Sequence, residues 1–307
     1  MSALSARSPA RLGTGMAVGS MLTAQIGLAL SMGLIHDVGA AGAAWLRLVW
    51  AALIFLALAR PRLSELSRET LRAGIPLGIV TAGVTMLFMA ALTHLSLGTA
   101  SALEFLGPLG VAVARSRGLA RAWVALAAAG ILCLTQPWSG AADAAGIGFA
   151  LGAACCWAAY ILLTQRIGDT VSGVRGLAIS MPVAALVATV VAGPHMLPRL
   201  TPELLVAGLG IAILLPVVPF SLEMLALRRL TTGAFGTLMA LEPAFALIIG
   251  FLVLHQRPDV VAVLGVFLVV GAGIGAERSG ARHVAPPSPV DEEALPPVPS
   301  SPALQEV

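Results

Sequence analysis

Ten apolar stretches follow one another along this chain, separated by short connectors. A helix needs ~20 mostly apolar residues to cross the hydrocarbon core of a bilayer. Charged residues make up only 11% of the chain, against about 25% in soluble domains, and the mean hydropathy is +0.94. These features predict an all-α membrane protein with ten transmembrane helices near residues 12–35, 39–59, 73–92, 95–114, 121–138, 144–165, 173–194, 204–227, 231–254 and 259–276.

The two ends of the chain differ from the apolar stretches between them. Residues 1–11 are predicted to form a cytoplasmic N-terminus, because the stretch 12–35 exceeds the ~7–15 apolar residues of a secretory signal and is interpreted as the first membrane helix. Residues 277–307 are rich in proline, serine and acidic residues, a composition typical of disordered segments. We expect a disordered Pro-rich cytoplasmic tail that can be removed without loss of function.

The placement of arginine predicts the orientation. All 18 basic residues are arginines. With the N-terminus in the cytoplasm, Arg199 and Arg257 fall outside and Arg47 falls within a helix, which leaves 15 on the cytoplasmic side. Membrane proteins concentrate arginine and lysine in short cytoplasmic loops. We therefore expect both termini in the cytoplasm of a bacterial-type inner membrane. Spread thinly over the loops, these arginines do not resemble a nucleic-acid surface.

An internal repeat divides the apolar region into residues 12–138 and 139–276. Residues 91–109 match residues 226–244 without a gap, and seven of the 19 positions are identical, including Gly98 with Gly233 and Pro108 with Pro243. A second match, at an offset of 133 residues, pairs the glycines at 13, 15 and 19 with those at 146, 148 and 152. Five helices in each half require the halves to insert with opposite orientation, which is the architecture of many secondary transporters.

Four charged residues lie inside the apolar stretches: Arg47, Glu104, Glu223 and Glu242. Counted at ~1.5 Å per residue, Arg47, Glu104 and Glu242 lie near the middle of the membrane, and Glu223 lies nearer the cytoplasmic end of its helix. A charge at that depth is costly and usually lines a substrate or ion path. An arginine and a carboxylate together match the two charges of an amino-acid zwitterion. The alternative is an internal ion pair that only holds helices together.

Prolines and a few polar or aromatic residues add to this pattern. Pro108 removes the hydrogen bond to the carbonyl of Glu104, and Glu242 directly precedes Pro243, so both carboxylates lie at loosened turns. Pro216 and Pro219 are expected to loosen the stretch 204–227 where it lines a cavity; the alternative is that they kink the helix for packing alone. Further candidates for lining a polar cavity, each of which could equally serve in packing or at the membrane interface, are Gln25, Trp45, Phe88, Trp157, Tyr160 and Gln165.

The remaining motifs do not indicate catalysis. The cysteines at 133, 155 and 156 and the five histidines lack the spacing of a metal site or a catalytic triad. Glycines near both ends of the apolar region lack the strand and helix context of a dinucleotide loop, and close helix packing explains them. We therefore expect no metal, no cofactor and no enzymatic activity.

Three segments of the chain resemble a known family. The triplet Leu241-Glu242-Pro243 and the ten-helix pattern resemble the EamA-type drug/metabolite transporter superfamily. Residues 101–109, 219–227 and 235–244 together are similar to the threonine/homoserine exporter branch. The resemblance covers about residues 12–276 and implies export of small amino acids from the cytoplasm by proton antiport. The Pro-rich tail is not part of it.

The residues and the resemblance together predict a secondary exporter of small polar amino acids that works by alternating access. Its partners would be the amino acid, protons and the lipid bilayer, and a homodimer is possible. Glu104 and Glu242 are expected to carry the protons and Glu223 to act as a gate. The residues expected to bind substrate are Arg47, Glu104, Glu242, Gln25, Trp157 and Tyr160. The alternatives are another metabolite or drug as the substrate, an intramembrane enzyme, or a scaffold without transport.

Overall fold

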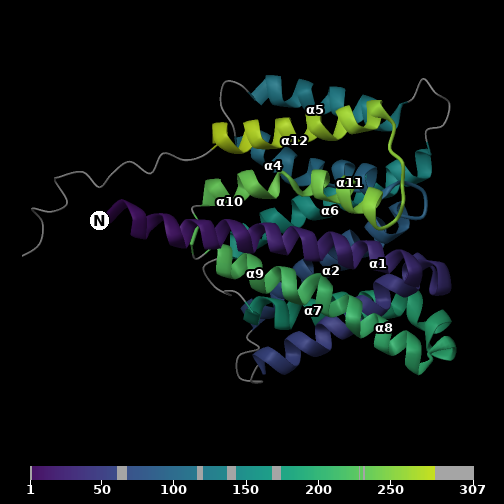
Figure 1. Ribbon diagram of the computed structural model, residues 1–307. Helices are drawn as coiled ribbons and strands as arrows, with labels where there is room; N and C mark the ends of the chain where they lie inside the picture. The colour runs from purple at the N-terminus through teal and green to yellow at the C-terminus, as the bar shows by residue number, and fades with distance from the viewer. Residues whose placement is uncertain are drawn as a thin grey trace, which may run out of the picture.

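The computed structural model describes residues 2–60, 68–115, 120–136, 143–167, 174–227, 229–230 and 232–280. Every regular element within these ranges is helical. The elements in order are α1 (Ser2–Ala59), α2 (Arg68–Ala91), α3 (Leu97–Glu104), α4 (Leu106–Arg115), α5 (Ala120–Thr135), α6 (Ala144–Ile167), α7 (Val174–Met196), η3 (Leu197–Arg199), α8 (Pro202–Ala212), η4 (Ile213–Val217), α9 (Val218–Leu227), α10 (Thr232–Met239), α11 (Glu242–Leu252) and α12 (Val260–Gly280). Figure 1 shows most of them running roughly along one direction.

These helices overlap the predicted stretches but differ from them at several ends; α2, for example, begins at Arg68, before the predicted residue 73. Helix α1 begins at Ser2 and α12 continues to Gly280, so both are longer than their apolar cores. Helix α5 ends at Thr135, before the predicted residue 138. A proline at 137 disfavours helical backbone at the preceding residue, and Gln136 adopts a positive φ of 40°. The predicted tail from 281 onward lies outside the described residues.

Glycine 39 divides α1 into two membrane-length pieces. Its φ of 75° and ψ of 167° interrupt the helix, and a positive φ costs glycine little because it has no Cβ. The apolar part of α1, Arg11–Ala59, has 49 residues. At ~1.5 Å per residue it would extend about 73 Å, more than twice the ~30 Å hydrocarbon core. The turn at Gly39 therefore lets a single element supply both of the first two predicted stretches.

Prolines interrupt three other stretches. Pro108 follows the break between α3 and α4, and Pro243 follows the break between α10 and α11. Each removes an N–H from the helical ladder. Pro216 lies in the π-helical turn η4, where Leu215 leaves helical geometry with φ −158° and ψ 110°. The breaks place Glu104 at the last residue of α3 and Glu242 at the first residue of α11.

The described helices make this chain a membrane protein of the all-α class. Six segments are long and apolar enough to cross a bilayer: Arg11–Ala59, Gly74–Ala91, Ala144–Leu163, Ala178–Arg199, Pro202–Glu223 and Phe235–Leu252. Shorter apolar helices are Leu97–Val111, Ala122–Thr135 and Val260–Gly275. Apolar side chains also cover the outside of the bundle, where Val260 is 85% and Val190 73% exposed. Such a surface suits lipid as the surrounding solvent.

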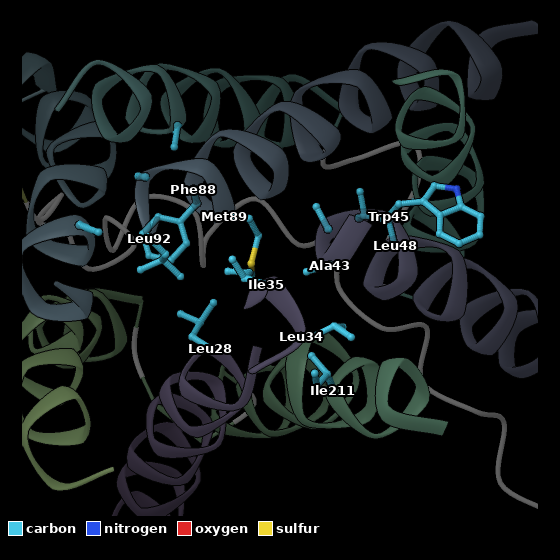
Figure 2. Packing of buried hydrophobic residues seen from close by; sticks show 14 of the residues in the cluster. Leu28, Leu34, Ile35, Ala43, Trp45, Leu48, Phe88, Met89, Leu92 and Ile211 are labelled. Carbon is cyan, nitrogen blue, oxygen red and sulfur yellow. The ribbon is translucent and has the colours of Figure 1, made fainter. Parts of the chain in front are cut away.

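The main core is formed mostly by α1, α2, α3 and α7, with further buried residues from α6, α8 and α11. Figure 2 shows Leu28 and Ile35 of α1 gathered with Phe88 and Met89 of α2. Many of the other buried residues in this cluster are alanines. Small residues let helix backbones approach closely, and this close packing drives helix association in membranes.

A second core joins α5 and α12. At Gly130 of α5 an added Cβ would lie 2.9 Å from the carbonyl oxygen of Gly265, and at Gly265 of α12 one would lie 2.8 Å from the carbonyl oxygen of Gly130. The two glycines therefore allow a reciprocal backbone contact that any side chain would prevent. Gly273 of α12 makes room for the ring of Phe105, whose Cε1 lies 2.7 Å from the position of an added Cβ. These contacts agree with the interpretation of the C-terminal glycines as packing residues.

Two glycines, one on α1 and one on α6, pack against turns between other helices. An added Cβ at Gly13 of α1 would lie 2.9 Å from Cγ of Leu230, in the turn between α9 and α10. An added Cβ at Gly146 of α6 would lie 2.9 Å from Cγ of Leu95, in the turn between α2 and α3. The same kind of contact thus occurs twice, and each time it joins the first half of the chain to the second.

Candidate functional site

Arg47 lies in the second part of α1 and is held by a hydroxyl from α2. Its Nη2 donates a hydrogen bond of 3.1 Å to Thr85 Oγ1, and Thr85 is only 4% exposed. The other terminal nitrogen, Nη1, is buried and has no hydrogen-bond partner. A buried guanidinium nitrogen without a partner is costly. Arg47 therefore presents a free donor inside the protein.

Glu104 is buried at the C-terminal end of α3, with 8% of its surface exposed. It lies within electrostatic range of both Arg47 and Glu242. The salt bridges among the described residues join His36 to Asp37 and His94 to Asp143, and neither includes Glu104. Among the described residues, Arg47 and Glu104 are thus electrostatic neighbours and not a closed ion pair.

Glu242 begins α11 and meets a side chain of α1. A carboxylate in the first helical turn is favoured by the helix dipole, and Pro243 at the next position is common at a helix start. Gln25 Nε2 donates a hydrogen bond of 3.3 Å to Glu242 Oε1. Gln25 is fully buried, and its Oε1 has no hydrogen-bond partner. The structure therefore brings together four of the predicted substrate residues, namely Arg47, Glu104, Glu242 and Gln25.

Glu223 lies on α9 and is held by Ser20 of α1. Ser20 Oγ is 2.8 Å from Glu223 Oε1 and 3.2 Å from the carbonyl oxygen of Pro219. Ser20 is fully buried, whereas Glu223 is half-buried. Glu223 also lies within electrostatic range of Glu242. The three carboxylates therefore form one electrically linked series.

The other predicted lining residues have different surroundings. Trp157 and Tyr160 are half-buried on α6, and their part in the site stays a prediction. Trp45 Nε1 donates a 2.8 Å hydrogen bond to Thr189 Oγ1 of α7, and Phe88 belongs to the main core, so both serve in packing. The side chain of the residue at 165 lies outside the described part of the structure.

Sequence reasoning missed Thr85 and Ser20, which hold Arg47 and Glu223. A hydroxyl in an apolar helix usually bonds to its own backbone four residues earlier. Thr81 and Ser31 do so, to the carbonyls of Leu77 and Gly27. Because the residue types are the same, the sequence contains no signal that separates the two behaviours.

A second set of polar contacts lies in the connections that join successive helices. His94 Nδ1 is 2.8 Å from Asp143 Oδ2, and Asp143 Oδ1 accepts hydrogen bonds from the backbone N–H groups of Gly146 and Ala145. The hydrogen bond from Gly146, followed by that from His94, holds the pKa of Asp143 below its usual value. Among the described residues, no group of three or more histidine, cysteine, aspartate or glutamate side chains is placed to hold a metal ion.

The contact at Asp259 has a similar form. Gln136 Nε2 donates a 2.6 Å hydrogen bond to Asp259 Oδ2, which links the end of α5 to the start of α12. Asp259 Oδ1 accepts from the backbone N–H of Ala262 at 2.6 Å. These hydrogen bonds, with that of Gln136 the strongest influence, lower the pKa of Asp259.

Comparison with known proteins places this arrangement in a family. A model of the EamA-like transporter family matches residues 144–275. The threonine/homoserine exporter RhtA of Escherichia coli K12 is 36% identical over 262 residues, which cover 84% of this chain and 88% of that protein. The exporter of the same name from Salmonella typhimurium matches with the same identity and coverage.

A solved crystal structure also matches. It is 18% identical in sequence and has a TM-score of 0.57, and the match covers 86% of this chain and 96% of the other. At that identity the likeness shows the fold alone.

Proposed function

This chain belongs to the EamA-like transporter family, and from that premise we propose that it is a secondary active exporter of small polar amino acids such as threonine and homoserine, driven by proton antiport. The proposal rests on one observation above all. A buried arginine with a free donor lies within electrostatic range of a buried carboxylate, in a chain 36% identical to threonine/homoserine exporters. Charges at that depth are retained for substrate and ion handling.

The architecture of the proposal is ten membrane helices in two inverted repeats of five. Two further contacts support it. Gly19 packs against Leu222, with the added-Cβ position 3.6 Å from Cδ1, and Gly152 packs against Leu87, at 3.2 Å from Cδ1. The glycines are 133 residues apart and the leucines 135, which are the two offsets of the sequence repeat. Inverted repeats have their substrate site near the midplane, between the halves.

The proposed mechanism assigns opposite charges to opposite ends of the substrate. Arg47 Nη1 binds the carboxylate, because it is a buried donor without another partner. Glu104 and Glu242 bind the ammonium group when ionised and bind a proton when the substrate has left. Substrate and proton therefore exclude one another at the same carboxylates, which is the condition for antiport. Gln25, Trp157 and Tyr160 complete the binding site.

Glu223 is the proposed cytoplasmic gate. It lies nearer the cytoplasmic end of its predicted membrane helix, and Ser20 joins it to α1. In this proposal both termini are cytoplasmic, and the protein resides in a bacterial-type inner membrane. Opening the α1–α9 contact would admit substrate from the cytoplasm.

Uptake of labelled threonine and homoserine into inverted membrane vesicles tests the function. An imposed proton gradient should drive accumulation, and unlabelled substrate should compete with it. Glu104→Gln and Glu242→Gln remove the titratable groups with little change of shape, and at least one should reduce gradient-driven uptake by about tenfold or more. Normal transport by both variants would refute the site. Vesicles that contain folded protein and accumulate neither amino acid would refute the substrate class.

A different metabolite or drug is the second candidate substrate, since the family premise alone does not fix the solute. A competition panel against labelled threonine separates the two. Strong competition confined to small amino acids favours the proposal, whereas competition by unrelated solutes favours the alternative.

A further inference from the structure

Gln25 has an unused hydrogen-bond acceptor next to the charged group. Its side chain is fully buried, and its Nε2 donates to Glu242. Its carbonyl oxygen Oε1 is buried without a partner. Buried side-chain oxygens almost always have a partner, so an exception beside a buried carboxylate calls for a ligand.

The orientation of this amide follows from chemistry. An ionised carboxylate can only accept hydrogen bonds, so the NH₂ group of Gln25 must face Glu242. The carbonyl oxygen then points away from that carboxylate. Reversing the amide would set two acceptors against each other. Ionised Glu242 therefore fixes Gln25 Oε1 as an acceptor available to something else.

Other buried polar side chains do not combine a free acceptor with a contact to a charged residue. Ser31, on the same helix and 1% exposed, donates to the carbonyl oxygen of Gly27 at 2.7 Å. Ser20 donates to Glu223. Ser180 Oγ on α7 is also without a partner, but Ser180 approaches Gly78 of α2 through its backbone oxygen and has no described contact with the charged residues. Gln25 is thus set apart by its contact with Glu242.

The free atoms at this place match three groups of one solute. Arg47 Nη1 is a free donor for a carboxylate, Glu104 and Glu242 are partners for an ammonium group, and Gln25 Oε1 is a free acceptor. We infer that Gln25 Oε1 accepts a hydrogen bond from a hydroxyl on the substrate side chain, so that the site selects hydroxy amino acids over analogues without that donor. This inference rests on the proposed function.

The physical basis of selection is the penalty for an unpaired acceptor. An analogue that fills the site but lacks the hydroxyl leaves Gln25 Oε1 buried and unbonded. Sites built to bond a hydroxyl reject such analogues far more strongly than apolar pockets reject a missing methylene. Valine is the sharpest probe, because a methyl group replaces the hydroxyl of threonine with little change of shape. 2-Aminobutyrate lacks the hydroxyl altogether.

The test is competition in proteoliposomes that contain the full chain. Counterflow of labelled threonine is measured against unlabelled threonine, valine and 2-aminobutyrate. In the wild type, both analogues should compete about tenfold or more weakly than threonine. Gln25→Met keeps the length and removes the acceptor, and should bring the three competitors within about threefold of one another. Ser31→Ala, on the same helix, should keep the wild-type ratio.

Each outcome decides between the two proposals. Counterflow in the wild type that does not distinguish threonine from valine overturns the inference and leaves the proposed function standing. A Gln25→Met protein that transports with the wild-type ratio does the same. Absence of any threonine counterflow in folded wild-type protein overturns the proposed function, and the inference with it. Because the wild-type ratio is measured without a substitution, the inference remains open to refutation even if Gln25→Met fails to fold.

Discussion

Two glycine contacts that join the two halves of the chain resemble each other in packing and differ in their polar groups. In the Gly13 contact, Gly13 lies against Arg229 and Leu230. In the Gly146 contact, Gly146 lies against His94 and Leu95. Each glycine lets a turn approach a helix more closely than a side chain would allow. On the predicted topology, the Gly13 contact is cytoplasmic and the Gly146 contact is external.

The difference between the contacts is an acid. Asp143 joins the Gly146 contact, with its carboxylate 2.8 Å from His94 Nδ1 and bonded to the Gly146 N–H. In the Gly13 contact, Arg229 Nη1 donates instead to the carbonyl oxygen of Leu225, in its own chain segment, and lies 3.6 Å from Met16 Sδ. Among the described residues, packing and the Arg229–Met16 contact close the Gly13 contact, whereas packing and the hydrogen bond between Asp143 and His94 close the Gly146 contact. Alternating access with inverted repeats requires one such contact to open at a time.

Filling the glycine positions should have the largest effect. Gly146→Leu and Gly13→Leu each place a side chain where an added Cβ already lies under 3.0 Å from a neighbouring carbon. Overpacking of this kind costs about 1–3 kcal/mol in the closed contact, and 1.4 kcal/mol is a factor of ten. Transport should therefore fall about tenfold or more in both variants. Hydrogen exchange should rise in the turn at residues 94–95 for Gly146→Leu and at 229–230 for Gly13→Leu.

The chain contains matched controls for that experiment. Gly15 and Gly148 are two residues farther along the same helices, and nothing lies within 4 Å of an added Cβ at either. Gly15→Leu and Gly148→Leu should transport at wild-type rates. Equal losses in controls and test variants would mean that leucine perturbs these helices generally and that the contacts are not specific.

Removing the acid should have a smaller effect, confined to the Gly146 contact. Asp143→Asn keeps an oxygen for the Gly146 N–H but loses the charge beside His94. Exposed ion pairs contribute little, so we expect transport to fall by only about two- to fivefold. Hydrogen exchange should become faster at residues 94–95 and stay unchanged at 229–230. Faster exchange at residues 229–230 as well as at 94–95 would show that the two contacts are coupled, and would contradict an effect confined to the Gly146 contact.

The pH dependence of this effect has a definite sign. Hydrogen bonds from Gly146 and then His94 lower the pKa of Asp143 in the folded protein from 3.8. Its stabilising contribution is therefore present above pH 3.8 and disappears as the pH falls through the lowered folded value. The melting-temperature difference between wild type and Asp143→Asn should be constant from about pH 7 to pH 5 and should shrink as the pH falls below 3.8. A difference that grows on acidification would contradict this assignment.

The comparison also marks what the sequence could predict. Hydropathy predicted the helices because a membrane span depends on about 20 consecutive apolar residues. Proline placement predicted their breaks because proline acts on the local backbone. The pairing of Gln25 with Glu242 spans 217 positions. That pairing depends on how helices rotate against each other, which apolar composition does not encode when both core and lipid are apolar. The charges at 47, 104 and 242 were identifiable because burying a charge is costly in any packing arrangement.

Removing Asp259 should have a smaller effect than removing Asp143. Its carboxylate binds Gln136 and the start of α12, as Asp143 binds His94 and the start of α6. However, the reciprocal contact of Gly130 and Gly265 already holds α5 to α12. Asp259→Ala should lower the melting temperature by only about 2 °C and leave transport within about twofold of wild type. A transport loss equal to that of Asp143→Asn would show that transport needs an acid at a helix start in general. The effect would then not be specific to the Gly146 contact.

Arg229→Ala should have the smallest effect, and it tests directly whether the Gly13 contact is apolar. The substitution keeps the Cβ that lies 3.0 Å from the position of an added Cβ at Gly13, and it keeps Leu230. It removes a guanidinium whose described hydrogen bonds are a contact with Met16 Sδ and one with Leu225 O. Because exposed polar contacts of this kind contribute little, hydrogen exchange at residues 229–230 and threonine transport should both remain at wild-type values. A loss as large as that of Asp143→Asn would mean that charge closes both contacts, and the difference between the two contacts would then lie elsewhere.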